Sequence, residues 1–367
     1  MSSSRITTRE QLHHYLYAAM QLEHATIPPY LTALYSIRPG TNADAYHVLR
    51  VTAVEEMLHL TLAANLLNAV GGTPDLTRAD FVPQYPAYLP DGEDDFQVSL
   101  RRFSREALET FLSIERPRQA PDEASRLINR GRPKRNRLGT SPNEPELQFF
   151  SIGEFYHEIW RGLHHLHEEL GADLFSGDPA RQVTPEYFYS GGGEITPVTD
   201  LASARTAIEL ISEQGEGFGG RIHDAENELA HYYRFEQLTL GRYYLDGDEG
   251  GQPTGPALEV DWQSAFPIKM DARLADYPVD SEVYQAAVDF NRGYAEFLQL
   301  LTSAFNGRPS LLLEAVIDMF RLREQITRLM HNPIPGLAGV NAAPTFEMAV
   351  QAVVPQPQNP QPAGVVS

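Results

Sequence analysis

Two segments of the chain carry the pattern Glu-x-x-His, at Glu56 to His59 and at Glu228 to His231. Residues three apart lie on the same face of an α-helix, so each pattern would place a carboxylate beside an imidazole. Glu56 and His59 also fall in line with the inward-facing stripe of their segment, formed by Leu49, Thr52, Ala63, Leu66 and Val70. An unpaired carboxylate buried in such a stripe is costly, and a metal ion is a usual compensation. The pattern therefore predicts metal ligands.

Glu23 occupies a similar row on an earlier segment, together with Leu12, Leu16, Ala19 and Thr26. Dimetal carboxylate bundles take one Glu from each of two helices and one Glu-x-x-His from each of two others. Glu23, Glu56 and His59 fill half of that set. Glu154 or Glu158, with Glu228 and His231, would complete it. The alternative for Glu154 is structural, because Ser151 and Glu154 have the spacing of a helix-capping box.

Glycines interrupt the predicted helix that precedes His231, in the string Glu213-Gln214-Gly215-Glu216-Gly217. Glycine costs about 1 kcal/mol in a helix interior, so the helix is expected to break here. Two arrangements remain open. Either Glu216 supplies a ligand before the break and His231 supplies one after it, or helix restarts near Asp224 and Glu228 partners His231.

Pro28 and Pro29 follow closely after Glu23. Two prolines remove the hydrogen bonds that would reach the carbonyl groups of His24 and Ala25, so a kink or bulge is expected just past Glu23. The alternative is that one helix ends at Ile27 and another begins at Pro28.

Helical periodicity places the long elements around these residues. The predicted helices cover 8–34, 44–70, 105–112, 146–170, 200–214, 224–243, 281–305 and 310–330. They predict a mainly all-α chain with a four-helix bundle at 8–245, a C-terminal helical extension packed on it at 246–345, and a disordered tail at 354–367. Residues 73–142 form a long excursion from the bundle, and its basic run at 126–137 is expected to be a solvated loop.

The composition limits the remaining functions. The 367 residues include no cysteine, which excludes disulfides, zinc–thiolate sites and iron–sulfur clusters. A net charge of −20 disfavours nucleic acid and anionic lipid as partners. The sequence contains no run of about 18 apolar residues that would predict a membrane span. Residues 1–10 lack the apolar core of a signal peptide, so a cytoplasmic protein is expected. The run His164-His165-x-His167 is expected to be a solvated helix end rather than a metal site.

Several strings in the chain resemble the bacterial ferritin-like family named for iminophenyl-pyruvate dimer synthase. They are Leu22-Glu23-His24-Ala25-Thr26-Ile27-Pro28-Pro29-Tyr30-Leu31, Glu55-Glu56-Met57-Leu58-His59-Leu60, Ser151-Ile152-Gly153-Glu154-Phe155-Tyr156, Gln214-Gly215-Glu216-Gly217 and Leu229-Ala230-His231-Tyr232-Tyr233-Arg234-Phe235. The resemblance covers about residues 8 to 245. It implies a ferritin-like four-helix bundle with metal ligands at Glu23, Glu56, His59, Glu154, Glu216 and His231, while the spacing keeps Glu228 as a rival to Glu216.

Some members of that family lie inside larger enzymes that couple amino-acid-derived imines on the way to bisindole pigments. The resemblance therefore implies a dimetal oxidase, oxygenase or imine-processing enzyme of secondary metabolism, acting on a small aromatic or amino-acid-derived metabolite. Two divalent metal ions are expected, with iron first and manganese or zinc as alternatives. The alternative functions are a non-enzymatic metal-binding bundle and a structural bundle without metal. The sequence leaves the oligomeric state open, and a homo-oligomer is compatible with it.

Overall fold

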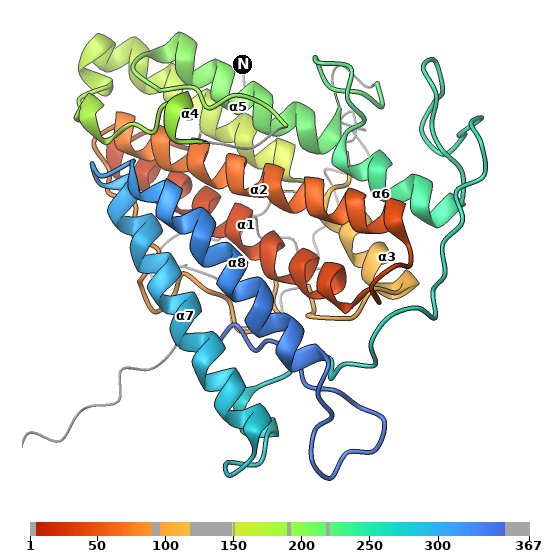
Figure 1. Ribbon diagram of the computed structural model, residues 1–367. Coiled ribbons are helices and arrows are strands. Elements are labelled where there is room, and N and C mark those ends of the chain that lie inside the picture. Colours follow the sequence, from red (N-terminus) through yellow and green to blue (C-terminus); the bar gives the residue numbers. More distant parts are fainter. Residues whose placement is uncertain are drawn as a thin grey trace, which may run out of the picture.

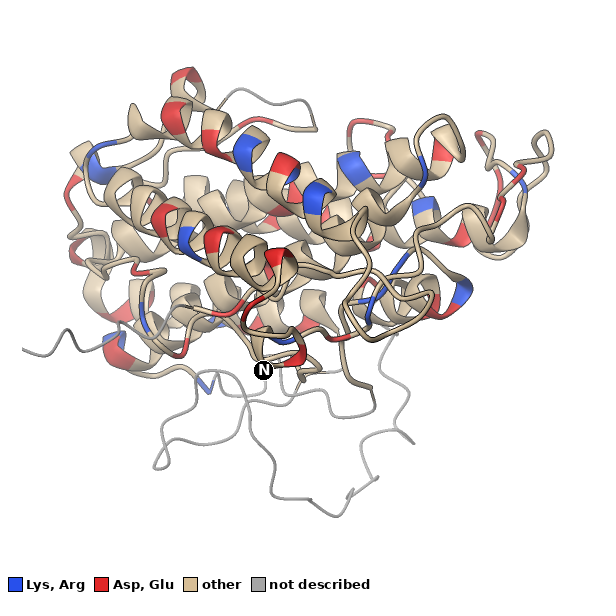
Figure 2. Cartoon of the chain, turned by 60° about the horizontal axis from the view of Figure 1, so that its bottom comes forward, with Lys and Arg blue, Asp and Glu red and all other residues tan. Residues whose placement is uncertain are grey.

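The computed structural model describes residues 5–89, 96–117, 149, 151–188, 192–217 and 221–348. Within these ranges the chain is built from α-helices, short 3-10 turns and isolated β-bridges (Figure 1). The predicted mainly all-α class is confirmed. No helix in the described ranges is long and apolar enough to cross a membrane. Acidic residues are spread over several helices instead of gathering on one face (Figure 2).

A pair of long helices forms the centre of the molecule, α1 (Arg9–Ser36) and α2 (Ala43–Ala69). A capping box between Thr8 and Gln11 starts α1. The helices α4 (Ile152–Leu170) and α5 (Leu201–Glu216) contact one side of this pair. Residues buried in α1 occur all around the helix, as expected for a helix covered on more than one side.

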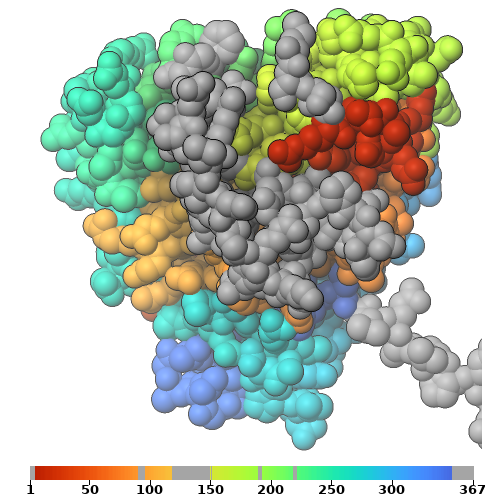
Figure 3. All heavy atoms as spheres, turned by 180° about the vertical axis from the view of Figure 1, so that it is seen from behind, coloured from red at the N-terminus to blue at the C-terminus, as the bar shows by residue number. Residues whose placement is uncertain are grey.

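The C-terminal helices α7 (Glu282–Phe305) and α8 (Leu311–Met330) pack against each other and against the α1–α2 pair (Figure 1). Seen from behind, the first described residues lie beside the segment that holds α4, and the C-terminal helical segment lies at another edge (Figure 3). The α1–α2 pair is therefore a layer with bundle helices on one face and the helical pair on another.

The prolines do not end α1, which runs without interruption through Pro28 and Pro29. The alternative in which the first helix ends at Ile27 is therefore wrong. Pro29 cannot donate to the carbonyl of Ala25, and the hydroxyl of Tyr85 donates to that carbonyl instead, at 2.8 Å. A side chain from outside the helix thus replaces one of the missing backbone bonds.

The helix expected at 224–243 is shorter than predicted, because α6 spans only His231–Leu240. The Asp224 carboxylate accepts the N–H groups of Glu226 and Glu228, at 3.0 and 2.8 Å, and so forms a local turn. Asn227 adds a positive φ of 65°. Glu228 therefore lies in this turn and not on the helix of His231.

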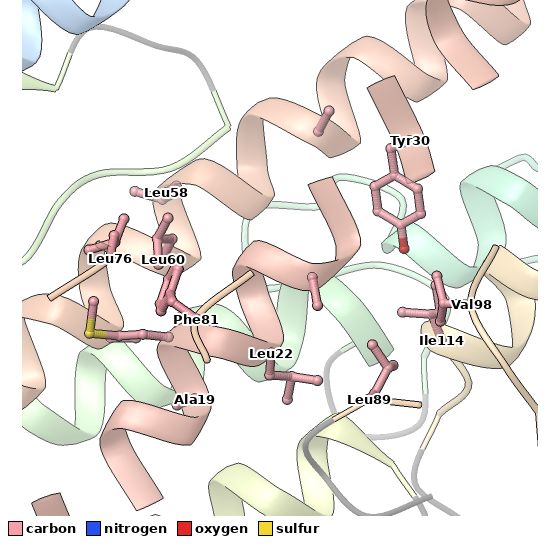
Figure 4. Packing of buried hydrophobic residues seen from close by; sticks show 14 of the residues in the cluster. Ala19, Leu22, Tyr30, Leu58, Leu60, Leu76, Phe81, Leu89, Val98 and Ile114 are labelled. Carbon is pink, nitrogen blue, oxygen red and sulfur yellow. The ribbon is translucent and has the colours of Figure 1, made fainter. Parts of the chain in front are cut away.

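The excursion contributes a helix of its own, α3 (Arg105–Ile114), which contacts α6. The hydroxyl of Ser104 caps its first turn by accepting from the N–H of Ala107 at 3.2 Å. Figure 4 shows Tyr30 extending from α1 toward Ile114 at the end of α3. This contact brings the excursion to the bundle interior. The basic run at 126–137 and the tail at 354–367 lie outside the described residues.

Candidate metal centre

Two groups of buried acidic and imidazole side chains meet inside the bundle and share Glu56. One group is Glu23, Glu56 and His59, and the other is Glu56, Glu115 and His231. Within each group the ligand atoms lie within 4.8 Å of one another. They come from α1, α2, the end of α3 and the start of α6. A shared carboxylate between two such groups is the arrangement expected of a dimetal site.

The hydrogen bonds of Gln214 fix the orientation of His59. The amide nitrogen of Gln214 donates to the carbonyl of Gly192, so its Oε1 atom is left to accept. That Oε1 atom lies 2.8 Å from His59 Nε2, which must therefore carry the proton. The Nδ1 atom, which would be the free nitrogen of the neutral ring, faces the carboxylates, 3.5 Å from Glu23 Oε2 and 3.8 Å from Glu56 Oε1.

His231 is oriented in the same way from another side. Its Nε2 atom lies 2.7 Å from Glu55 Oε2, and Arg234 also binds that carboxylate. Its Nδ1 atom lies 3.1 Å from Glu56 Oε1 and 3.5 Å from Glu115 Oε2. This buried Nδ1 atom lies close to both carboxylates but forms no well-aligned hydrogen bond with either, as expected of a metal ligand whose other nitrogen is held by a carboxylate.

Hydroxyl groups hold the outer oxygens of the three carboxylates. Tyr156 donates to Glu23 Oε1 and Tyr30 donates to Glu115 Oε1, each at 2.5 Å. Thr26 lies 2.9 Å from Glu56 Oε2. One oxygen of each carboxylate is thus held by a hydroxyl group, as is usual for carboxylates that bind a metal ion.

The centre without metal is an unfavourable place for negative charge. Burial first, and then the Glu115 carboxylate, raise the pKa of Glu56 to about 7. Burial alone would lower the pKa of His231, but Glu115, Glu55 and Glu56 raise it well above its usual value. Both shifts show a demand for positive charge among the carboxylates, which a divalent cation would supply.

The space among these groups fits an ion. A cavity of about 10 Å³ lies between Glu23, Glu56, His59, Glu115 and Glu216, which is room for about one water-sized sphere. The donors are carboxylate oxygens and neutral imidazole nitrogens, a set that suits iron, manganese and zinc. The unpartnered Nδ1 of His231 and this donor set together show that the residues present fit a metal centre.

The structure separates the rival predicted ligands. Glu216 ends α5 and lines the small cavity, while its Oε1 atom accepts from Gly153 N at 2.8 Å and from the Ser151 hydroxyl at 2.9 Å. The side chain of Glu228 is 52% exposed and pairs with Arg234 at 3.1 Å. Glu154 lies half-buried in the first turn of α4, outside both groups, and its N–H donates to the capping hydroxyl of Ser151 at 3.2 Å.

Sequence reasoning missed Glu115, because that residue lies in the excursion and belongs to no Glu-x-x-His pattern. A signal was present. Leu108, Phe111 and Glu115 follow one another at helical spacing, so Glu115 continues the apolar row of α3. Glu55 and Gln214 were also missed, because residues that orient ligands have no spacing rule of their own.

Comparison with known proteins gives the class of the chain. A family model described as ferritin-like matches residues 16–240, and the chain belongs to the ferritin-like family. The family expected from the sequence motifs is thus confirmed. A crystal structure of a ferritin-like protein from Caulobacter vibrioides shares the fold, with a TM-score of 0.57 and 21% identity over 88% of this chain and 95% of that chain.

Among curated proteins, the chain is similar to dichlorochromopyrrolate synthase of Lentzea aerocolonigenes. The two are 28% identical over an alignment of 333 residues, and the match covers 81% of this chain. The match covers only 29% of the length of that synthase. The likeness therefore connects this chain with a part of a larger protein.

Proposed function

We propose that this chain is a metal-dependent enzyme of secondary metabolism, an oxidase or imine-processing enzyme that acts on a small aromatic or amino-acid-derived metabolite. The observation that carries the proposal is the pair of ligand groups that share Glu56, with the Nδ1 atoms of His59 and His231 both directed at carboxylates. Iron is the expected metal, and similarity to dichlorochromopyrrolate synthase supports the area of metabolism.

The ligands would be Glu23, Glu56 and His59 for one ion, and Glu56, Glu115 and His231 for the other. Bound divalent metal ions would supply Lewis-acid or redox chemistry at this place. Glu216 is the further carboxylate that lines the same cavity.

The surrounding residues keep the centre oriented and dry. Tyr30, Phe111 and Phe235 form an aromatic cluster beside Glu115, with ring centroids 4.7 to 5.4 Å apart. All three rings are buried. They exclude water from this side of the centre and so strengthen the electrostatic interactions within it.

Space for an organic molecule lies close to the centre. A cavity of about 510 Å³ is lined by Glu55, Arg234 and Gly192, among others. Glu55 also contacts His231, so one side chain that lines the cavity touches a ligand of the centre. A volume of this size suits a small metabolite. This space favours an enzyme over a bundle that only stores metal.

The proposal is tested by reconstituting the chain with ferrous iron and supplying imines generated in situ from aromatic amino acids by an amino-acid oxidase. Oxygen consumption and mass spectrometry would follow the reaction. We expect product formation that depends on iron and is lost in His231→Ala. Full iron loading without consumption of any imine or aromatic amino acid would instead support a non-enzymatic metal-binding protein.

A further inference from the structure

A second cavity lies between the α1–α2 layer and the C-terminal helical pair. Its volume is about 300 Å³. Its α1 wall includes Ile27 and Leu31, and its α2 wall includes Met57 and Leu60. Ile27 and Leu60 lie one helical turn beyond Glu23 and Glu56, so this space begins one turn away from the metal centre. None of the residues that line it belongs to the two ligand groups of the metal centre.

The wall of this cavity is apolar and rich in aromatic rings. They include Phe188, Phe290, Phe297 and Phe305. Ala315 of α8 is buried and faces the same space, where its small side chain leaves room. A volume at the lower end of the range for ligand pockets fits a molecule with one or two rings.

One polar atom in this wall lacks a hydrogen-bond partner, and it belongs to His24. His24 is only 3% exposed, and its Nε2 atom contacts the hydroxyl of Tyr294. Its Nδ1 atom is buried without a hydrogen-bond partner. An unsatisfied buried polar atom costs about 1–3 kcal/mol, and a ligand with a polar atom would remove that cost.

The cavity also carries positive charge where it reaches the surface. Arg50 of α2 and Arg323 of α8 are exposed residues that line it. Burial raises the pKa of the Tyr35 hydroxyl, which lines the same cavity, and the charges of the two arginines oppose this shift. Neither forms a salt bridge with a carboxylate of the described residues. Two unneutralised arginines from different helices are notable in a chain with a net charge of −20. They make this opening suitable for an anionic group.

We propose that this cavity binds a small aromatic carboxylate. The ring packs among the phenylalanines, the carboxylate lies at Arg50 and Arg323, and the Nδ1 atom of His24 meets a polar atom of the ligand. This inference does not rest on the metal centre, because none of the residues that line the cavity belongs to the two ligand groups.

The test measures binding of naphthylacetate by calorimetry, with the uncharged naphthylacetamide as a matched ligand. We expect the acid to bind at least tenfold more tightly than the amide. Arg323→Gln should weaken binding of the acid at least tenfold, whereas Arg328→Gln, an exposed arginine of the same helix outside the cavity, should not. Ala315→Phe should abolish binding of both ligands by filling the space.

His59→Ala serves to separate this site from the metal centre. We expect naphthylacetate to bind this variant, and the chelator-treated chain, as tightly as it binds the unaltered protein. Because Arg323 is exposed, its variant tests the site even if Ala315→Phe fails to fold. The proposal would be overturned if removal of the metal also abolished binding of naphthylacetate. Equal affinity for acid and amide, or unchanged affinity in Arg323→Gln, would overturn it as well.

Discussion

His231 Nε2 lies 2.7 Å from Glu55 Oε2, and both side chains are fully buried. The Glu55 carboxylate accepts a hydrogen bond from this nitrogen, and Arg234 balances the charge of the carboxylate. The other ring nitrogen is directed at Glu56 and Glu115, where it would bind a metal ion in the neutral form of the ring. Glu55, which is next to Glu56 in the sequence, thus orients the ligand His231, which lies 176 positions further along the chain.

This relationship predicts that Glu55→Gln weakens metal binding by about 10- to 100-fold, the usual cost of losing a partner that orients a ligand. Glutamine keeps the size of the side chain but loses the charge that holds His231 and Arg234. Competition with a chromophoric chelator would measure the affinity. Glu228→Gln is the matched control, because Glu228 also pairs with Arg234 but is half exposed. Equal losses in both variants would show that Arg234, and not His231, transmits the effect.

A second prediction concerns the ligand that comes from the excursion. Glu115→Ala should remove about one of two bound metal ions, because only the group of Glu56 and His231 contains Glu115. Glu154→Ala should leave the metal content unchanged, since this residue lies outside both groups. Elemental analysis of the two purified variants would give the answer. Metal loss in Glu154→Ala alone would place the second ion near α4 instead of α3.

Part of this centre could be predicted from the sequence. Glu23, Glu56 and His59 were accessible because they lie on long helices, where a period of 3.6 residues assigns each position to a face. His231 was found, but its helix was predicted to begin too early. The turn at Asp224 depends on side-chain hydrogen bonds that periodicity does not encode.

The limits in the rest of the fold have a similar cause. The long helices and the bundle were predictable from local patterns, whereas the position of α3 depends on contacts with α1 and α6 that are distant in sequence. Helix α1 passes through two prolines because Tyr85, some 60 residues away, satisfies a freed carbonyl. Such compensation can be recognised only once the chain is folded.

The metal-free chain should lose stability as the pH rises through the titration of Glu56. Its pKa is raised by burial and by Glu115 from 4.5 to about 7. Because the pKa of Glu56 is higher in the folded chain than in the unfolded chain, the protonated carboxyl group stabilises the fold. This stabilisation is complete below pH 4.5 and is lost above about pH 7. Glu56→Gln cannot ionise, so at pH values above the Glu56 titration the metal-free variant should be more stable than the unaltered chain by about 3 kcal/mol.

Denaturant unfolding of chelator-treated protein at several pH values would measure this difference in the free energy of unfolding. The two proteins should differ least in acid, where the carboxyl group is neutral like the amide. A difference that stays constant with pH would contradict the raised pKa and would indicate a packing effect of the substitution.

Tyr85 should stabilise α1 through the carbonyl that Pro29 leaves without a donor. Tyr85→Phe is expected to lower the free energy of unfolding by about 1–3 kcal/mol, because the Ala25 carbonyl would then be buried without a partner. In a Pro29→Ala background the new N–H can bond this carbonyl, so Tyr85→Phe should cost less there. A double-mutant cycle measures the coupling, and strictly additive effects would rule out the compensation.

Glu56 would belong to two metal sites at once, and the number of metal ions bound per chain is the direct test of this arrangement. Protein reconstituted with ferrous iron, manganese or zinc and then desalted should hold about two ions per chain. His59→Ala should lose most of this metal, whereas His165→Ala should keep it, since His165 lies 3.5 Å from Glu169 on the outer face of α4. Fewer than about 0.2 ions per chain for every metal, or equal losses in both histidine variants, would contradict the dimetal account, in which each group must hold an ion.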